Sequence, residues 1–377
     1  MRALSYSITL ELEKKLKNIN SLCSSTKERL KILPEEHRDY IRRNALISNI
    51  GASTRIENAI LTNVEIDWLD ETLGKDAKKG SFEKNKKAIE NKLSKDKQRS
   101  IEEVAGLRQV LHLVYAQATE LFPIREADLR ELHRQLLEYY GAAAHYIGRY
   151  KIAPNSVIER VGNKVTREIF KTAEPGPITA AAMQDLVTWY NKALPEHLWS
   201  LAVIAEFVYR FLAIHPFQDG NGRLGRALFH LGMLHSPDES LSFMAPYLAI
   251  DRQIEKAKPE YYIVLRQCSG GIYRPDPTEY SMERFLNFML KMLERSLTED
   301  IQYYHDKYLA YQKLGPRAVK TLQCFREHPE TTQTTGALAG ETGMNRRTVI
   351  RSLHELIDAG FLQELGKGPG TYYRLIF

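Results

Sequence analysis

The strongest constraint on the fold lies in the middle of the chain, where a long apolar stretch runs directly into a polar, glycine-rich one. Seventeen mostly apolar residues, 198–214, precede the sequence HPFQDGNGRLGR at 215–226. Seventeen residues are too many for one strand, and Glu206 and Arg210 are four positions apart, as on one face of a helix. The pattern of 227–234 is helical again. We therefore expect a buried helix, a tight loop at DGNGR, and a second helix that begins at this loop.

The expected loop has the properties of an anion-binding site. A helix N-terminus presents unpaired N–H groups and the positive end of the helix dipole, so it attracts phosphate groups. Gly220, Gly222 and Gly225 also satisfy the spacing G-x-G-x-x-G of dinucleotide-binding folds. That motif follows a strand and needs an acidic residue about twenty positions later. Here a helix precedes it and Met244 and Ala245 stand at that distance, so we exclude the dinucleotide fold.

Four side chains of the stretch indicate what the anion is. Arg223 and Arg226, three positions apart at the start of a helix, can form forked hydrogen bonds with phosphate oxygens. Asp219 offers the single hard oxygen ligand with which proteins hold Mg²⁺ when substrate phosphates complete its shell. His215, at the end of the preceding helix, can take a proton from an attacking hydroxyl. Together these groups predict attack on a nucleotide phosphate.

The whole stretch resembles the motif H-P-F-x-[DE]-G-N-[GK]-R-x-x-R of the Fic family, which it matches at every defined position. Members of this family typically transfer AMP from ATP to a hydroxyl side chain of a target protein. The resemblance covers about residues 116–300 and implies a Fic-type helical core with a β-hairpin flap. It implies a protein adenylyltransferase that modifies Tyr, Ser or Thr of a target protein, and itself, with ATP as co-substrate and Mg²⁺ as cofactor.

The resemblance also implies roles for individual residues. His215 would be the catalytic base, Phe217 would anchor the loop in the core, and Asp219 would hold Mg²⁺ against the phosphates. Gly220, Asn221 and Gly222 would form an anion hole. Arg223 and Arg226 would contact the outer phosphates, and Tyr261 and Tyr262 would form the adenine site. Residues 148–170, whose β-branched positions flank Gly162 and Asn163, resemble the flap on which the target protein docks by strand addition.

A second motif lies far upstream. STRIEN, from Ser53 to Asn58, resembles the [ST]-x-x-x-E-[GN] motif of the inhibitory helix that some family members carry ahead of the catalytic core. The resemblance implies that Glu57 pairs with Arg226 and repels the γ-phosphate, so that ATP binds unproductively. Two alternatives stay open. Thr54 and Glu57 also fit a capping box at a helix N-terminus, and in some relatives the same glutamate is reported to position a water that removes AMP.

Three regions of the chain differ in composition. Residues 1–115 have heptad-like apolar spacing and predict a helical N-terminal segment, 116–300 predict the catalytic domain, and 315–377 predict two short helices joined by a turn and followed by a hairpin. The net charge of +6 equals the excess of ten basic over four acidic residues within 75–100. We interpret that stretch as a solvated, mobile connector or helix face. The sequence thus predicts a mainly α protein.

The C-terminal region resembles a winged helix-turn-helix domain. In that arrangement Arg346, Arg347, Thr348 and Arg351 would face the DNA major groove, and Lys367 would lie on the wing. However, residues 315–377 carry eight basic and six acidic side chains, a small excess for a DNA-binding module. Docking of a protein partner or homodimerisation is the alternative. A DNA-binding transcriptional regulator with a nucleotide-sensing core therefore stays open as a second function class.

The remaining sequence features concern location and redox state. The first twenty residues contain no apolar signal-peptide core, and charged residues interrupt the run 198–214, so we expect no membrane span and a cytoplasmic protein. Cys23, Cys268 and Cys324 are odd in number and far apart, which argues against a disulfide framework or a metal site.

Overall fold

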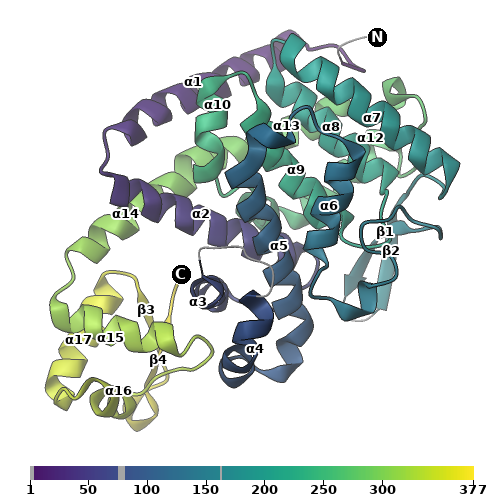
Figure 1. The fold of residues 1–377 in the computed structure, drawn as a ribbon. Helices are drawn as coiled ribbons and strands as arrows, with labels where there is room; N and C mark the ends of the chain where they lie inside the picture. Colours follow the sequence, from purple (N-terminus) through teal and green to yellow (C-terminus); the bar gives the residue numbers. More distant parts are fainter. Residues whose placement is uncertain (1–3, 75–80, 162–163) are drawn as a thin grey trace.

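The computed structural model describes residues 4–74, 81–161 and 164–377, and it is mainly α-helical, as predicted (Figure 1). The N-terminal part contains α1 (Leu10–Lys31), α2 (Glu35–Ile56), α3 (Asn63–Leu73), α4 (Ser81–Lys92) and α5 (Gln98–Gln117). The middle part contains α6 (Glu126–Leu136), β1 (Ser156–Val161), β2 (Lys164–Lys171), α7 (Pro177–Glu196), α8 (Ser200–Ile214), α9 (Asn221–His235), α10 (Glu239–Met244), α11 (Ile250–Lys256), α12 (Lys258–Ser269), α13 (Met282–Arg295) and α14 (Ile301–Gln312). The C-terminal part contains α15 (Pro316–Glu327), α16 (Thr335–Thr342), α17 (Arg346–Asp358), β3 (Leu362–Leu365) and β4 (Tyr372–Leu375).

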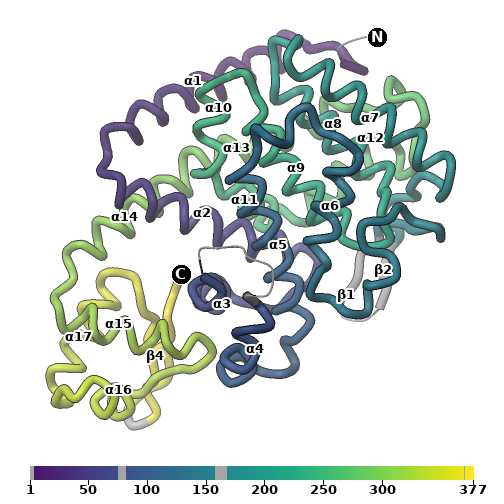
Figure 2. Tube along the Cα trace, in the orientation of Figure 1, coloured from purple at the N-terminus to yellow at the C-terminus, as the bar shows by residue number. Residues whose placement is uncertain are grey.

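The helix α8 lies at the centre of the middle part (Figure 2). All of its residues are buried except Arg210, which is partly exposed. A helix that is apolar on every side is stable only when other helices surround it, and α8 packs against α7, α9 and α13. The loop that follows α8 therefore begins inside the protein. Within the described ranges, no helix combines the length and apolarity needed to cross a membrane.

The helix α2 brings the upstream motif into the same region. From Ala45 onward most of its residues are buried, and the helix packs against α5, α11 and α14. Its buried polar residue Asn49 is satisfied at both ends of its amide: Nδ2 donates to Leu248 O at 2.7 Å, and Oδ1 accepts from Asp251 N at 3.1 Å. These contacts set the position of α2 along its own axis, so its C-terminal end has a defined place beside α9.

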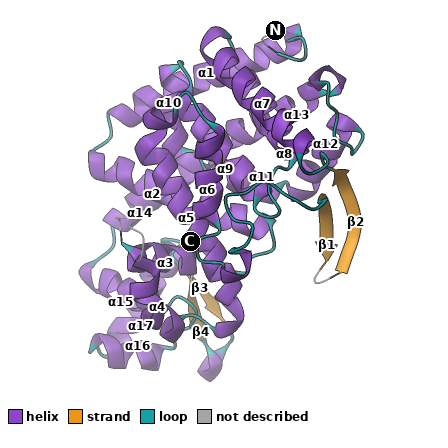
Figure 3. Cartoon of the chain, turned by 45° about the vertical axis from the view of Figure 1, so that its right-hand side comes forward, coloured by secondary structure: helices purple, strands orange, loops and turns teal. Residues whose placement is uncertain are grey.

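The flap is a hairpin, as predicted, but its strands begin later in the chain than the sequence indicated. Strands β1 and β2 are antiparallel and project from the helical body (Figure 3). Residues 148–155 are not part of these strands. This segment lies alongside the loop after α8, where Tyr150 forms an isolated bridge with Phe217. The predicted turn at 162–163 lies outside the described residues.

The lysine-rich stretch is in large part a helix face. Helix α4 buries Phe82 and Ile89 and exposes its lysines. The Phe82 ring lies 4.6 Å from the ring of Tyr139, which attaches the helix to the body. Residues 75–80, the other part of the predicted connector, lie outside the described residues.

The C-terminal part has a hydrophobic core of its own, built around Phe325, Leu338 and Leu353. Its last two helices and hairpin follow one another in the predicted order. It contacts the N-terminal part through Lys97, whose Nζ pairs with Glu330 at 2.9 Å and also with Glu65 on α3. Figure 1 accordingly places this part beside α3 and α4.

The crossing of α5 and α6 provides a test of this packing. A Cβ at Gly106 on α5 would overlap the carbonyl oxygen of Leu136. We expect Gly106→Ala to lower the free energy of unfolding by about 2–3 kcal/mol, because backbone cannot move aside as a flexible side chain can. Gly340→Ala on α16 is the matched control, since its Cβ would meet open space; there we expect no loss, and a gain of up to about 1 kcal/mol. Urea unfolding compares the two variants, and equal midpoints would contradict the predicted close crossing.

Candidate active site

The residues 215–226 form the connection between α8 and α9. Helix α8 ends because His215 has a left-handed backbone with φ 53°, while its N–H still donates to Phe211 O at 2.9 Å. Helix α9 begins after Gly220, whose φ of 79° is a conformation that glycine adopts without strain. The N–H groups of Asn221 and Gly222 then have no acceptor inside the helix. The loop thus opens a helix N-terminus, as predicted.

Donors from other segments, together with Asn221 of the connection itself, bind the carbonyl groups in and next to this connection. Lys151 donates from Nζ to Ile214 O at 3.0 Å and from its backbone N to Pro216 O at 2.8 Å. Phe217 O accepts from Asn155 Nδ2 and from Asn221 Nδ2, at 2.7 Å each. Asp219 O accepts from His133 Nε2 at 2.9 Å. These bonds hold the loop in one conformation.

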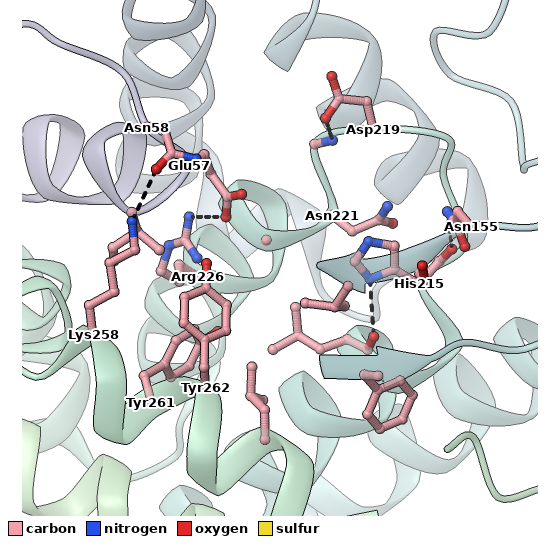
Figure 4. A pocket seen from close by; sticks show the side chains of 18 of the residues that line it. Glu57, Asn58, Asn155, His215, Asp219, Asn221, Arg226, Lys258, Tyr261 and Tyr262 are labelled. Carbon is pink, nitrogen blue, oxygen red and sulfur yellow. Dashed lines mark hydrogen bonds and ion pairs between the residues drawn. The ribbon is translucent and has the colours of Figure 1, made fainter. Parts of the chain in front are cut away.

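His215 presents a free ring nitrogen to a cavity. Its Nδ1 lies 3.2 Å from Leu212 O, and because a carbonyl can only accept, Nδ1 carries the proton and Nε2 has a free lone pair. Burial lowers the pKa of His215 to about 4, and the positive charge of Lys151 acts in the same direction. The imidazole is therefore neutral at pH 7. In Figure 4 the nitrogen that makes no bond faces Asn221.

The cavity has a volume of about 740 Å³ and brings most of the predicted site residues together. Its lining includes His215 and the following predicted residues from α2, the loop, α9 and α12: Glu57, Asn58, Asp219, Gly220, Asn221, Gly222, Arg226, Tyr261 and Tyr262. Residues far apart in sequence thus meet at one site, because α2 packs against α9 and the tyrosines of α12 lie beside Arg226 (Figure 4).

Arg223 departs from its predicted position. Its side chain is 2% exposed and does not line the cavity. Its Nη2 lies 3.4 Å from Asp219 Oδ1, and its Nη1 lies 3.7 Å from Glu103 Oε1 on α5. The predicted contact of Arg223 with outer phosphates stays a prediction; in this structure the side chain turns toward two carboxylates. It orients Asp219, while Arg99, which sequence reasoning missed, lines the cavity.

The upstream motif lies across the cavity from His215, at the C-terminal end of α2 (Figure 4). Arg226 Nη2 donates to Glu57 Oε1 at 2.9 Å and to Ser53 O at 2.8 Å, and Arg226 Nε donates to Ser53 Oγ at 2.7 Å. Burial opposes the charge of this guanidinium, but the Glu57 carboxylate outweighs it and raises the pKa of Arg226. A Cβ at Gly222 would overlap Glu57 Oε1. The carboxylate thus lies directly against the N-terminus of α9.

This geometry excludes the capping-box interpretation of the STRIEN motif. Thr54 lies in the last turn of α2, where its Oγ1 donates to Ile50 O at 2.9 Å, and Glu57 is the C-cap. A capping box needs both residues at a helix N-terminus, so that alternative is wrong. Asn58 adopts a left-handed φ of 73° directly after the helix, a position that suits asparagine. It ends α2 so that Glu57 faces the cavity.

Tyr261 and Tyr262 on α12 lie beside Arg226 and Lys258 (Figure 4). Their rings are 5.5 Å apart, and burial raises the pKa of Tyr261 to about 12. The Tyr261 side chain therefore stays uncharged at neutral pH, and the two rings form an aromatic wall next to Arg226.

Sequence reasoning did not identify His133 on α6, which is fully buried. Its ring stacks on Phe217 with centroids 3.9 Å apart and planes at 4°, so Phe217 does anchor the loop in the core. Nδ1 accepts from Gly148 N at 2.9 Å, while Nε2 donates to Asp219 O. Burial lowers the pKa of His133 to about 4, so the ring stays neutral. A neutral ring can accept at Nδ1 and donate at Nε2. A single histidine in a helical pattern gives no sequence signal that distinguishes this role from ordinary packing.

Asp219 is the candidate ligand for a metal ion. No three His, Cys, Asp or Glu side chains converge in the part of the chain that the structure describes. The Asp219 side chain is 37% exposed, and its Oδ1 accepts from Gly220 N at 2.6 Å. One carboxylate with an accessible oxygen fits Mg²⁺, which commonly takes one or two protein carboxylates and completes its shell with phosphates and water.

Comparison with known proteins identifies relatives of the part of the chain that contains this site. Residues 123–233 match the model of the Fic/DOC family. The protein adenylyltransferase Fic of Drosophila willistoni is 27% identical over 191 residues, which make up 49% of this chain and 34% of that protein. The protein of the same name from Drosophila melanogaster is 26% identical over the same length. The matched part is thus about a third of the length of these curated relatives.

Solved structures agree on the fold. A Fic family protein from Desulfovibrio desulfuricans superimposes with a TM-score of 0.57 and 22% identity, covering 99% of this chain and 98% of that one. A Fic domain containing signaling protein from Bacteroides thetaiotaomicron gives a TM-score of 0.55 and 24% identity, covering 77% and 97%. The matched family model includes the α8–α9 connection, so residues 123–233 form a domain of the Fic/DOC family.

Proposed function

We propose that this protein transfers AMP from ATP to a hydroxyl side chain of a target protein and that Glu57 keeps it inactive. The observation that carries the proposal is the Glu57 carboxylate, which lies against Gly222 at the N-terminus of α9 and is bonded to Arg226. A helix N-terminus with a buried arginine is a site for an anion, and in this structure a side chain of the chain itself supplies that anion. The names of the adenylyltransferase relatives support the same chemistry.

His215 would act as the general base. Its neutral Nε2 takes the proton of the target hydroxyl while that oxygen forms a bond to the α-phosphorus of ATP. The bond from the α-phosphorus to the bridging oxygen breaks, and pyrophosphate leaves. The N–H groups at the start of α9 would stabilise the charge on the phosphoryl oxygens. Asp219 would hold Mg²⁺, which supplies further charge neutralisation at the phosphates when bound.

The flap would hold the target beside this base. Ser156 and Val157, the first residues of β1, line the same cavity as His215. A target segment that adds to the hairpin as a further strand would therefore pass close to Nε2. Strand addition recognises backbone more than side chains, which leaves the acceptor as Tyr, Ser or Thr.

Glu57 would inhibit by occupying this site. Its carboxylate uses a hydrogen-bond donor of Arg226 and places negative charge where an outer phosphate of ATP would bind. Like charges at this distance repel, so ATP would bind only in a displaced pose. The inhibition would be relieved when the end of α2 moves away.

The first prediction concerns this inhibition. We expect Glu57→Gly to raise AMP transfer by roughly tenfold or more, since a charged hydrogen bond contributes about 1.5–3 kcal/mol and the Glu57 side chain is one-third exposed. The measurement is intact mass spectrometry after incubation with ATP and Mg²⁺. We expect an added adenylyl group in Glu57→Gly and none in Glu57→Gly combined with His215→Ala.

The control for the inhibition experiment is Glu57→Gln, which keeps the side-chain volume and loses the charge. We expect intermediate activity. Equal activity of wild type and Glu57→Gly would contradict the inhibitory role. Loss of AMP from a previously modified target, seen only with Glu57 intact, would support the reverse reaction instead.

The second prediction concerns pH. Because the pKa of His215 is lowered to about 4, the neutral base is present above that value, and the transfer rate should fall only as the pH approaches it. An imidazole in water would lose activity around pH 6.5. Initial rates of the Glu57→Gly variant between pH 4.5 and 8 provide the measurement. A midpoint near 6.5 would contradict the buried, neutral base.

DNA binding by the C-terminal part is the second candidate function. One observation favours it: Arg346, Arg347 and Arg351 are exposed on the first two turns of α17. Arginines in the first turns of such a helix are suited to reach bases and phosphates in the major groove. We expect retention of the full chain on double-stranded DNA to weaken with salt and to be lost in Arg346→Glu/Arg347→Glu. Retention that is absent at low salt would exclude this function and favour protein docking.

A further inference from the structure

We propose that Lys151 is a positioning residue for the catalytic loop: its buried ammonium group holds the backbone around His215 so that the imidazole faces the acceptor hydroxyl. This inference rests on the proposed function, because it gives Lys151 a part in the same transfer.

The Lys151 side chain ends in an unusual place. It is 2% exposed, and its Nζ donates to Asn155 Oδ1 at 2.8 Å, to Thr172 Oγ1 at 2.9 Å and to Ile214 O at 3.0 Å. All three acceptors are uncharged. Among the carboxylates whose side chains the structure describes, none lies within 4 Å of Nζ. Burying an ammonium group costs several kcal/mol, and a methionine would fill the same space without that cost. Packing alone therefore does not explain a lysine here.

The acceptors of Lys151 explain the charge. The backbone at His215 is left-handed, which costs a residue with a side chain about 1–2 kcal/mol, so surrounding groups must hold it. Lys151 bonds the carbonyl before His215 with Nζ and the carbonyl after it, Pro216 O, with its own N–H. Asn155, oriented by the ammonium group, donates to Phe217 O at 2.7 Å and to His215 O at 3.4 Å. One residue thus controls the carbonyls on both sides of the base.

The same contacts connect the loop to the flap. Lys151 and Asn155 precede β1, and Thr172 directly follows β2. The Thr172 hydroxyl accepts from Lys151 and donates to Asn155 O at 2.7 Å. The base of the hairpin therefore closes around the ammonium group. A target that pulls on the flap would act on the backbone of His215 through this cluster.

The charge of Lys151 has a second effect on the base. The charged groups that act on His215 are Lys151, which disfavours the imidazolium, and Glu57 and Asp219, which favour it. Lys151 in turn is affected by Glu174, and burial lowers the pKa of Lys151 to about 8. At neutral pH most of the lysine is therefore protonated. It holds the loop and disfavours protonation of the base at the same time.

The experiment compares Lys151→Met with a matched control in the Glu57→Gly background. We expect Lys151→Met to lower kcat for AMP transfer by about 10- to 100-fold, the size of effect that follows from a small displacement of a catalytic group. The KM for ATP should change by less than about threefold. Lys192→Met replaces an exposed lysine on α7 and should leave both values unchanged.

A second measurement does not depend on transfer. Proton–nitrogen NMR of ¹⁵N-histidine protein, assigned by comparison with His215→Ala, reports the tautomer and the pKa of His215. We expect Lys151→Met to raise this pKa and to reduce the Nδ1–H tautomer. If the background variant transfers no AMP, the proposed function fails, while these resonances still decide the role of Lys151.

A third variant covers the case in which Lys151→Met does not fold. Thr172→Val removes an acceptor of Lys151 and keeps the volume. Among the described residues, the Thr172 hydroxyl bonds to Lys151 and Asn155 and not to the loop itself. We expect it to lower kcat by about three- to tenfold and to shift the His215 resonances in the same direction. The proposal would be overturned if folded Lys151→Met has a kcat within twofold of the background and unchanged His215 resonances. If Lys151→Met does not fold, the same result for folded Thr172→Val would overturn it.

Discussion

The left-handed turn at His215 is the constraint on which the rest of the site depends. It ends α8 inside the protein and lets the chain reverse into α9, so that the helix N-terminus and the imidazole meet in one cavity. Such a turn is strained for a residue with a side chain. It persists because Lys151, Asn155 and His133 bind the loop carbonyls from outside. Catalytic geometry and flap geometry are therefore parts of one hydrogen-bonded structure.

Arg226 connects the catalytic core with the N-terminal helices. Its guanidinium is bonded to the backbone and hydroxyl of Ser53 and to the Glu57 carboxylate. A buried guanidinium requires such acceptors, so the end of α2 stabilises the fold as well as covering the cavity. An ATP phosphate could replace the Glu57 carboxylate while the two Ser53 bonds remain. Under the proposed function, inhibition would involve the Glu57 bond to Arg226, while the two Ser53 bonds support the fold.

Sequence reasoning identified the residues that form a local motif and missed those that act from other segments. His215, Asp219, Gly220 and Asn221 lie within a few positions of each other, and their chemistry is legible from residue type and spacing. For Arg223, helical spacing predicts the side of the helix on which the residue lies but not the neighbour on that side. Glu103 of α5 was the unforeseen neighbour. Lys151 and His133 carried no motif at all.

The sequence by itself determined the mainly helical class, the buried helix before the motif, the helix N-terminus at Gly220 and the hairpin, because these follow from periodicity, glycine placement and β-branched residues close together in the chain. The tertiary contacts, in contrast, make Glu57 a C-cap that faces Arg226 rather than part of a capping box, and they bring Tyr150 into a bridge with Phe217 of the loop. The physical reason is that both depend on contacts between segments far apart in sequence. Local propensity permits several such pairings, and packing of the whole chain selects one.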